Sequence, residues 1–306
     1  MSDRFLPSWV GRTEAFFLRA LLVLTVLWSL STPSKYARLE DPAGLAKWGL
    51  PVTWIGQPGA HPWFLAAVVI FGMTYLLGLW RPGWLTFAGL GGMTYLHVGY
   101  WTLANSQGNT FHGSQMTSLV LVAQLAGWLV MRWREHSSSA VDARYPNLEG
   151  VLLYFSQCAI AGVYVTSAIT KLLKSEGRWL LDSHYFAKSV QKVWRQISLD
   201  NPSRQEFTGV SPWAEWLLHH PMLARLLFAP GFFLEMFAFL ILWNRAWAAG
   251  WGMALILMHV GIGIIMQLYF PEFEVLVLVF CLNVPYWLSR ICRNQPGTLT
   301  KKINTA

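Results

Sequence analysis

Apolar segments of about 20 residues recur along the whole chain, and they constrain its fold more than any other feature of the sequence. The hydrocarbon core of a bilayer offers no water to bare backbone groups, so a segment of this length and composition predicts a spanning helix. About eight segments qualify. They lie near residues 14–31, 62–80, 84–103, 114–131, 151–173, 223–243, 247–268 and 273–289, and the last is short and interrupted by Pro285. The prediction is an all-α, polytopic transmembrane helical bundle.

The charge content supports a membrane protein. Only 12% of the 306 residues are charged, whereas an ordinary soluble domain carries roughly 25%. The chain also has 18 Trp and 10 Tyr, residue types that collect at membrane–water interfaces. Its net charge of +8 comes from cations that flank apolar segments and form no basic run, so membrane lipid is the expected partner and nucleic acid is not.

The connections predict one domain, 1–306, with neighbouring helices antiparallel where the turns are short. Arg81–Gly83 and Asn244–Arg245 are turns of this kind. Two connections are long, about 32–61 and 174–222. Aromatic and basic residues alternate in the second one, which favours helices lying in the plane of the interface over a small extramembrane cap.

The distribution of Lys and Arg predicts which ends are cytoplasmic. With the N-terminus inside, the cations of the termini and short loops share one side: Arg4, Arg12, Arg81, Arg132, Arg134, Arg144, Arg245, Arg290, Arg293, Lys301 and Lys302. The loop at 104–113 and the turn at Pro271, which lack Lys and Arg, then lie outside with both long connections. Both termini are therefore predicted to be cytoplasmic. No small-x-small cleavage pattern follows the first apolar segment, which is expected to remain as an anchor.

Common motifs for metal, disulfide and hydrolytic chemistry do not occur. Cys158, Cys281 and Cys292 form no CxxC pair, so neither a disulfide framework nor a structural zinc site is expected. Histidine and carboxylate suit iron, zinc or manganese, but HxxxH, HExxH and ExxH spacings do not occur. No metal is expected. Nucleophile elbows, phosphate-binding loops and dinucleotide fingerprints are also missing.

Lys171 is the first candidate for a functional residue, because an ionisable group within a spanning helix is costly. It ends the apolar run of the fifth predicted helix on the predicted outer side. The alternative is a lysine that extends its ammonium to the interface while its stem stays in lipid, a description that fits Lys174 better. In a dry cavity a lysine becomes a usable base.

Three further side chains belong to the same hypothesis. Glu235 lies within the sixth helix without a cation nearby in the sequence, so it must be paired or protonated. His259 is similarly embedded in the seventh helix, and Gln267 lies two turns beyond it. The alternative is a structural polar clasp formed by Glu235 and His259.

His112 precedes the fourth helix on the predicted outer side. The alternative interpretation of His112 is an interfacial histidine that caps the start of the helix. His97, within the third predicted helix, is expected to pack in the bundle or to hydrogen-bond a neighbouring carbonyl. One cavity open to the outer face would bring His112 together with Lys171, Glu235 and His259. The sequence thus predicts a polar outer cavity.

These segments resemble the HTTM family, the membrane domain shared with vitamin K-dependent gamma-glutamyl carboxylase and with many bacterial proteins. Asn109–His112 resembles the family's Asn/His pair before a helix. Gly162–Leu172 followed by Trp179 resembles its Tyr, small residue, Lys-Leu and Trp segment. Glu235 followed by Met258–His259 resembles its later carboxylate and histidine. The resemblance covers most of the chain through short motifs, and it implies an integral protein of a bacterial inner membrane.

The resemblance implies a chemistry. Lys171 would be the base that deprotonates vitamin K hydroquinone or menaquinol, and His112 would lie near the developing charge. Oxygen then gives an alkoxide that removes a glutamate gamma-proton, and the carbanion attacks carbon dioxide. The substrate or quinone pocket would be lined by Asn109, Glu235, His259, Gln267 and Trp179.

Departures from the family pattern leave the substrate open. Thr170 stands where the carboxylase has a second basic residue, and Ser167 and Ala168 replace its Ala-Gly. No counterpart of the large lumenal domain follows the last span, so a peptide or small molecule is expected in place of a tethered protein. Two other function classes remain: a non-catalytic factor for the maturation of, or immunity to, a secreted peptide, and a transporter built on facing broken helices.

Overall fold

The computed structural model describes residues 9–31, 53–57, 59–81, 83–106, 114–137, 147–200 and 211–293. Every regular element within these ranges is a helix. The all-α prediction is therefore confirmed for the described part of the chain.

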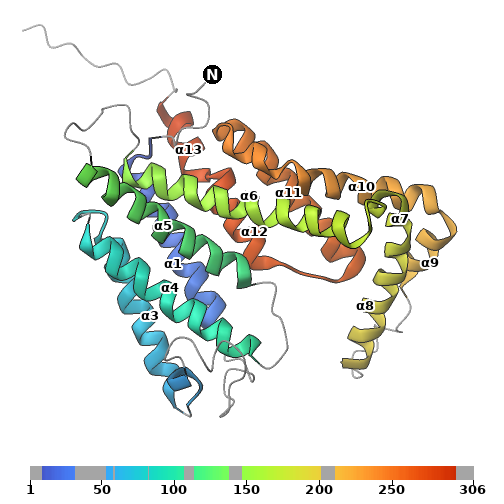
Figure 1. The fold of residues 1–306 in the computed structure, drawn as a ribbon, viewed down its shortest axis with the longest axis horizontal. Coiled ribbons are helices and arrows are strands. Elements are labelled where there is room, and N and C mark those ends of the chain that lie inside the picture. Colours follow the sequence, from blue (N-terminus) through green and yellow to red (C-terminus); the bar gives the residue numbers. More distant parts are fainter. Residues whose placement is uncertain are drawn as a thin grey trace, which may run out of the picture.

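The first half contains the helices expected from its apolar segments (Figure 1). They are α1 (Arg12–Ser31), the short 3-10 helix η3 (Thr53–Gly56), α3 (Ala60–Leu77), α4 (Trp84–Asn105), α5 (Gln115–Ser137) and α6 (Leu148–Lys174). α3 packs along α4 and α5 packs along α6, while α1 contacts both α3 and α4. The short turn between α3 and α4 thus joins neighbours, as predicted.

The second half is more broken than its sequence predicts. Its elements are α7 (Trp179–Asp182), η5 (Ser183–Tyr185), α8 (Phe186–Asp200), α9 (Pro212–His219), α10 (Pro221–Met236), η6 (Ala238–Leu242), α11 (Arg245–Met266), α12 (Pro271–Val277), η7 (Leu278–Leu282) and α13 (Val284–Arg293). In Figure 1 α8 runs crosswise to α6, at the end of the bundle where α6 finishes. The single helices predicted at 223–243 and 273–289 are both interrupted.

Proline and tertiary hydrogen bonds account for the break in the predicted 223–243 helix. α10 starts at Pro221 and is bent by 110° from α9. It carries Pro230 in its interior, ends at Met236 and continues as the 3-10 helix η6. Pro230 cannot donate to the carbonyl of Leu226 four residues earlier, which weakens the helix there. In the last turn of α10, where carbonyls lack intrahelical partners, the indole of Trp251 on α11 donates to the Leu234 carbonyl at 2.9 Å.

The last predicted span is interrupted just before Pro285. Leu278–Leu282 is π-helical, and Asn283 after it has a left-handed backbone with φ of 49°. A π-helical turn leaves backbone groups without their regular partners. Gln157 of α6 compensates, because its amide donates to the Phe280 carbonyl at 2.9 Å.

Six described helices are long and apolar enough to cross a membrane, or up to seven if the bent pair α9 and α10 is one span. The six are α1, α3, α5, α6, α11 and the stretch Pro271–Ile291. Large apolar side chains also remain exposed along these helices, including Ile70, Leu129, Leu257 and Ile264. Such a surface is suited to lipid. The protein is an integral membrane protein.

Close packing of α3 against α4 depends on Gly89, because a Cβ added there would collide with the backbone of Tyr75. Small residues allow helix backbones to approach in membranes. We expect Gly89→Leu to lower the free energy of unfolding by about 1–3 kcal/mol, measured as a shifted midpoint in a denaturing-detergent titration. Gly91→Leu on the same helix is the control, since a Cβ there meets nothing within 4 Å. Equal shifts for both variants would contradict the close-packing argument.

Candidate functional site

Lys171 and Glu235 form an ion pair between the last turns of α6 and α10. Glu235 is nearly enclosed, whereas the Lys171 side chain is 29% exposed. The Ser167 hydroxyl also donates to Glu235, at 3.2 Å. The carboxylate that lacks a cation nearby in the sequence thus acquires one from another helix.

Trp179 completes one side of this cluster. The Lys171 ammonium lies 5.5 Å from the centroid of the Trp179 ring. The ring stacks on Phe232 of α10 at a centroid distance of 5.1 Å. A cation over an indole face is stabilised by the ring quadrupole, more so where water is scarce. Lys171 is therefore held between a carboxylate and an aromatic ring.

The helical register of α6 explains why these groups meet. Tyr164, Ser167 and Lys171 are spaced by three and four residues and so lie along one face. The register starts from a defined cap: the side chain of Asn147 accepts from the Gly150 amide at 3.1 Å. The face carries three polar groups toward α10 and α11.

His259 of α11 is bonded to this same face. Its Nε2 lies 2.8 Å from the Tyr164 hydroxyl, and the rings of Phe270 and Phe273 pack around it. Nδ1 is buried and has no hydrogen-bond partner in the described residues. The alternative of a clasp between Glu235 and His259 has the wrong pairing, because Glu235 bonds to Lys171 and Ser167 of α6 and His259 bonds to Tyr164 of α6.

A groove of about 860 Å³ runs between α5 and α6 beside the ion pair. Its walls are mostly apolar and small, and its polar rim includes both candidate lysines. The lining residues are Gln115, Leu119, Val122, Ala123, Ala126, Cys158, Ala159, Gly162, Val163, Thr166, Ser167, Thr170, Lys171 and Lys174. Lys174 is exposed, and within the described part of the chain Lys171 is the one of the two lysines that is paired with a carboxylate. Both lysines therefore line the groove, but Lys171 is held by Glu235 whereas Lys174 extends into the surroundings.

The structure does not test two of the other predicted site residues, and it places a third, Gln267, at the end of α11. Asn109 and His112 lie at 107–113, outside the described residues. Gln267 caps α11 with a left-handed backbone. Its side chain donates to the Ile264 carbonyl at 3.3 Å and accepts from the Tyr269 hydroxyl at 3.0 Å. Both hydrogen bonds are to residues within three positions in the sequence.

His97 packs in the bundle, as predicted. Its ring nitrogens lie 3.1 Å from the Ser29 hydroxyl and 2.9 Å from the Ser118 hydroxyl. The histidine is fully buried. This accounts for a polar residue within α4 without a catalytic role.

Sequence reasoning missed a buried ion pair in which Arg19 of α1 bonds Glu149 of α6. The guanidinium reaches both carboxylate oxygens, at 3.0 and 2.5 Å. It also donates to the Tyr75 carbonyl near the C-terminus of α3 and packs on the Tyr75 ring. The signal was available, since Arg19 interrupts the first apolar segment. It lies about 10 Å along α1 from Arg12, at 1.5 Å per residue.

A second missed cluster joins α1 and the residue Trp9 before it to the starts of α11 and α13. Arg245 donates to Glu14 at 2.5 Å and to the Trp9 carbonyl at 2.8 Å. Asn283 also donates to Glu14, at 2.6 Å. The sequence predicts Arg245 as a loop cation, but α1 provides it with a carboxylate.

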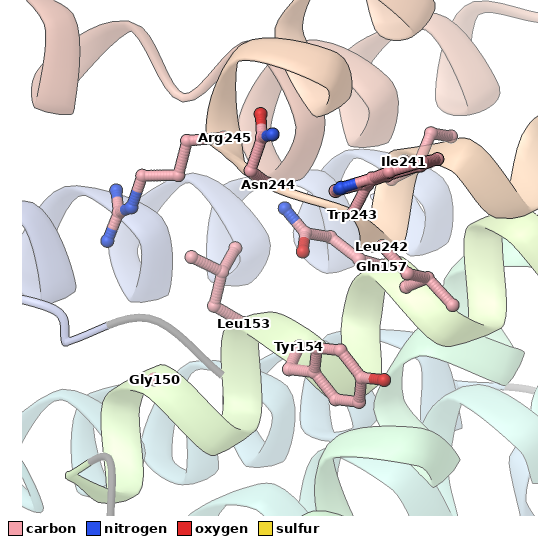
Figure 2. Close-up of a pocket in the computed structure, with 9 residues that line it drawn as sticks. All are labelled: Gly150, Leu153, Tyr154, Gln157, Ile241, Leu242, Trp243, Asn244 and Arg245. Carbon is pink, nitrogen blue, oxygen red and sulfur yellow. The ribbon is translucent and has the colours of Figure 1, made fainter. Parts of the chain in front are cut away.

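Figure 2 shows a small cavity beside Arg245, where α6 meets the turn that leads into α11. Gln157, Trp243 and Asn244 line it, but the Gln157 amide donates to the Phe280 carbonyl and the Asn244 side chain accepts from the Trp247 amide. The volume is about 30 Å³, which is enough for about one water molecule. This cavity is too small for a substrate.

Among the described residues, no group of three His, Cys, Asp or Glu side chains is placed to hold a metal ion. No family model, curated protein or solved structure matches the chain significantly. The geometry of the site offers a lysine on the wall of an apolar groove, held by a nearly enclosed carboxylate on the neighbouring helix.

Proposed function

We propose that this protein is an integral membrane enzyme in which Lys171 accepts a proton from the hydroxyl of a quinol bound in the groove between α5 and α6. The observation that carries the proposal is that Lys171, which lines this groove, is also paired with the nearly enclosed Glu235. The best ligand for such a site has an apolar body and one weakly acidic hydroxyl, and a hydroquinone has both.

The residues around the groove have separate roles in the proposed reaction. Lys171 hands its ammonium proton to Glu235 as the ligand arrives, and the free amine then takes the hydroxyl proton. Ser167 and Trp179 hold the two charged groups in place. Small residues such as Gly162 and Ala159 leave room for a flat ring. The hydroquinone anion would supply electrons for reaction with oxygen, as in the carboxylase that the sequence resembles.

The number of spans and the orientation of the chain in the membrane are also part of this proposal. We count eight spans by adding α4, a continuous 22-residue helix, and α10 with η6. We place both termini in the cytoplasm of a bacterium and the Lys171 end of α6 on the outer side of the inner membrane. Vitamin K hydroquinone or menaquinol, oxygen and carbon dioxide are the proposed reactants, with a peptide or small molecule as the final acceptor.

Replacement of Lys171 tests the proposal. In lipid nanodiscs supplied with menaquinol and oxygen, we expect Lys171→Met to reduce the rate of quinol oxidation by about 10²–10⁴-fold, the contribution of a general base. Lys174→Met is the matched control, because Lys174 lines the same groove without the Glu235 partner. Quinol oxidation and the folded state, followed by size exclusion, are measured together. A folded Lys171→Met protein with full activity would refute the role of Lys171.

The non-catalytic alternative is a factor that binds a secreted peptide for maturation or immunity. The observation that favours it is that the Glu235 carboxylate already bonds to both Lys171 and Ser167. A carboxylate satisfied in this way can be purely structural. It predicts stable binding without turnover. If the wild-type protein binds menaquinol or a peptide but oxidises no quinol under any oxygen tension, this alternative replaces the enzyme.

The two broken helices favour a transporter as a further alternative. The breaks at α10–η6 and at α12–η7 both flank α11, and interrupted helices are typical of transport sites. Counterflow of a labelled substrate across proteoliposomes would support this reading, which requires no dependence on oxygen.

A further inference from the structure

α8 is fixed to the bundle by one face only. Ala187 packs with Leu217 and Ala224, and Val190 packs with Met266 of α11. The indole of Trp194 donates to the Ile265 carbonyl at 3.2 Å. The apolar side of α8 is thus occupied by α9, α10 and α11, and the helix lies crosswise to α6 (Figure 1).

The opposite face of α8 carries a basic stripe. Lys188, Lys192 and Arg195 are spaced by four and three residues, so they follow one side of the helix. Together with Leu199 and Leu218 they line a groove of about 520 Å³. None of the three is in an ion pair with a carboxylate of the described residues. The stripe is therefore positively charged and not neutralised by that part of the chain.

Exposed apolar side chains border the basic stripe. Leu199 is 80% exposed and Leu218 is 50% exposed. Trp213 and Trp216 of α9 are also exposed. Leucine beside lysine and tryptophan is typical of the membrane interface, where the cations reach headgroups and the apolar groups reach acyl chains. The basic side and the apolar side of the groove would then each contact a matching part of a lipid.

We infer that this groove binds an anionic phospholipid, with the headgroup phosphate against Lys188, Lys192 and Arg195 and an acyl chain along Leu199 and Leu218. Charge complementarity selects an anion. A free phosphate ion would satisfy the cations but leave both leucines in water, so a lipid is the better fit. The bound lipid would hold α8 in the interface plane, independently of any chemistry at Lys171.

The inference predicts a lipid preference that depends on the basic stripe. Full-length protein is mixed with equal amounts of phosphatidylglycerol and phosphatidylcholine, and retained lipid is counted by native mass spectrometry. We expect phosphatidylglycerol to be retained in preference. Each cation near an anionic surface contributes about fivefold to binding, so Lys192→Gln should lower retention about fivefold, and replacing all three by Gln should abolish the preference.

Matched variants separate the groove from general surface charge. Arg178→Gln removes one cation near the same end of α6, where Arg178 is paired with Asp182, and should leave the preference unchanged. Lys188→Arg with Lys192→Arg keeps the charge and should retain it. An unfolding midpoint equal to that of the wild type shows that the variants are folded.

Three outcomes would overturn the inference. One is an unchanged preference in the folded triple variant. Another is displacement of phosphatidylglycerol by millimolar inorganic phosphate, which would assign the groove to a small anion. The third is tight binding of a polyglutamate peptide without any phospholipid preference, which would assign it to an acidic peptide.

Discussion

Arg19→Met is expected to lower the free energy of unfolding by about 3–5 kcal/mol, the cost of breaking a buried ion pair by removing one partner. Arg19 is only 2% exposed and makes two hydrogen bonds to Glu149. It also donates to the Tyr75 carbonyl near the C-terminus of α3, where helix carbonyls lack intrahelical partners. The variant leaves a carboxylate and a carbonyl unsatisfied together. The midpoint of a denaturing-detergent titration measures the loss.

A double variant tests the cause. Arg19→Met with Glu149→Met removes both charges, and replacement of a buried pair by apolar residues is often neutral. The double variant should therefore recover most of the lost stability. Arg132→Met is the control, because it breaks the exposed pair with Glu135, and such pairs contribute about 0–1 kcal/mol. A double variant less stable than Arg19→Met would contradict the ion-pair explanation.

Glu14→Ala should cost about 3–5 kcal/mol, again because one partner of an enclosed pair is removed. Glu14 of α1 accepts from both Arg245 and Asn283, so two segments lose the acceptor that they share: the start of α11 and the residue before α13. The lost stability is measured as a shift in the midpoint of unfolding.

Asn283→Gly separates the carboxylate from its second donor. Asn283 has a left-handed backbone that glycine adopts without strain, so the variant loses only its side-chain bonds, the one to Glu14 and a longer one from the Tyr286 amide at 3.4 Å. We expect the free energy of unfolding to decrease by about 1.5–3 kcal/mol, mainly the contribution of a hydrogen bond to a charged group. If Asn283→Gly costs as much as Glu14→Ala, the ion pair with Arg245 is not the main contribution.

Part of the candidate site could be predicted from the sequence. Lys171, Glu235 and His259 stand out because each is an ionisable residue within an apolar segment, and all three lie at one contact region of α6 with α10 and α11. Their pairing could not be read in advance, since residues 64 and 95 positions apart meet only through helix packing. Glu235 bonds Lys171 in place of His259 for this reason.

The helix breaks in the last third of the chain also depend partly on local sequence and partly on tertiary contacts. Pro285 marks an interruption in the sequence, but the π-helical turn before it is supported by Gln157 from α6. The 3-10 helix after α10 likewise follows a carbonyl bonded to Trp251. Local sequence indicates where a helix is weak, and distant side chains decide whether it breaks there.

The sequence alone determined that this is an all-α membrane protein, because long apolar segments can satisfy their backbone groups in lipid only as helices. It also identified the costly ionisable residues. Tertiary structure alone decided their partners: Lys171 with Glu235, Arg19 with Glu149, and Arg245 with Glu14. The physical reason is that hydrophobicity is a property of each segment, whereas a buried charge is stabilised only by the particular group that packing places beside it.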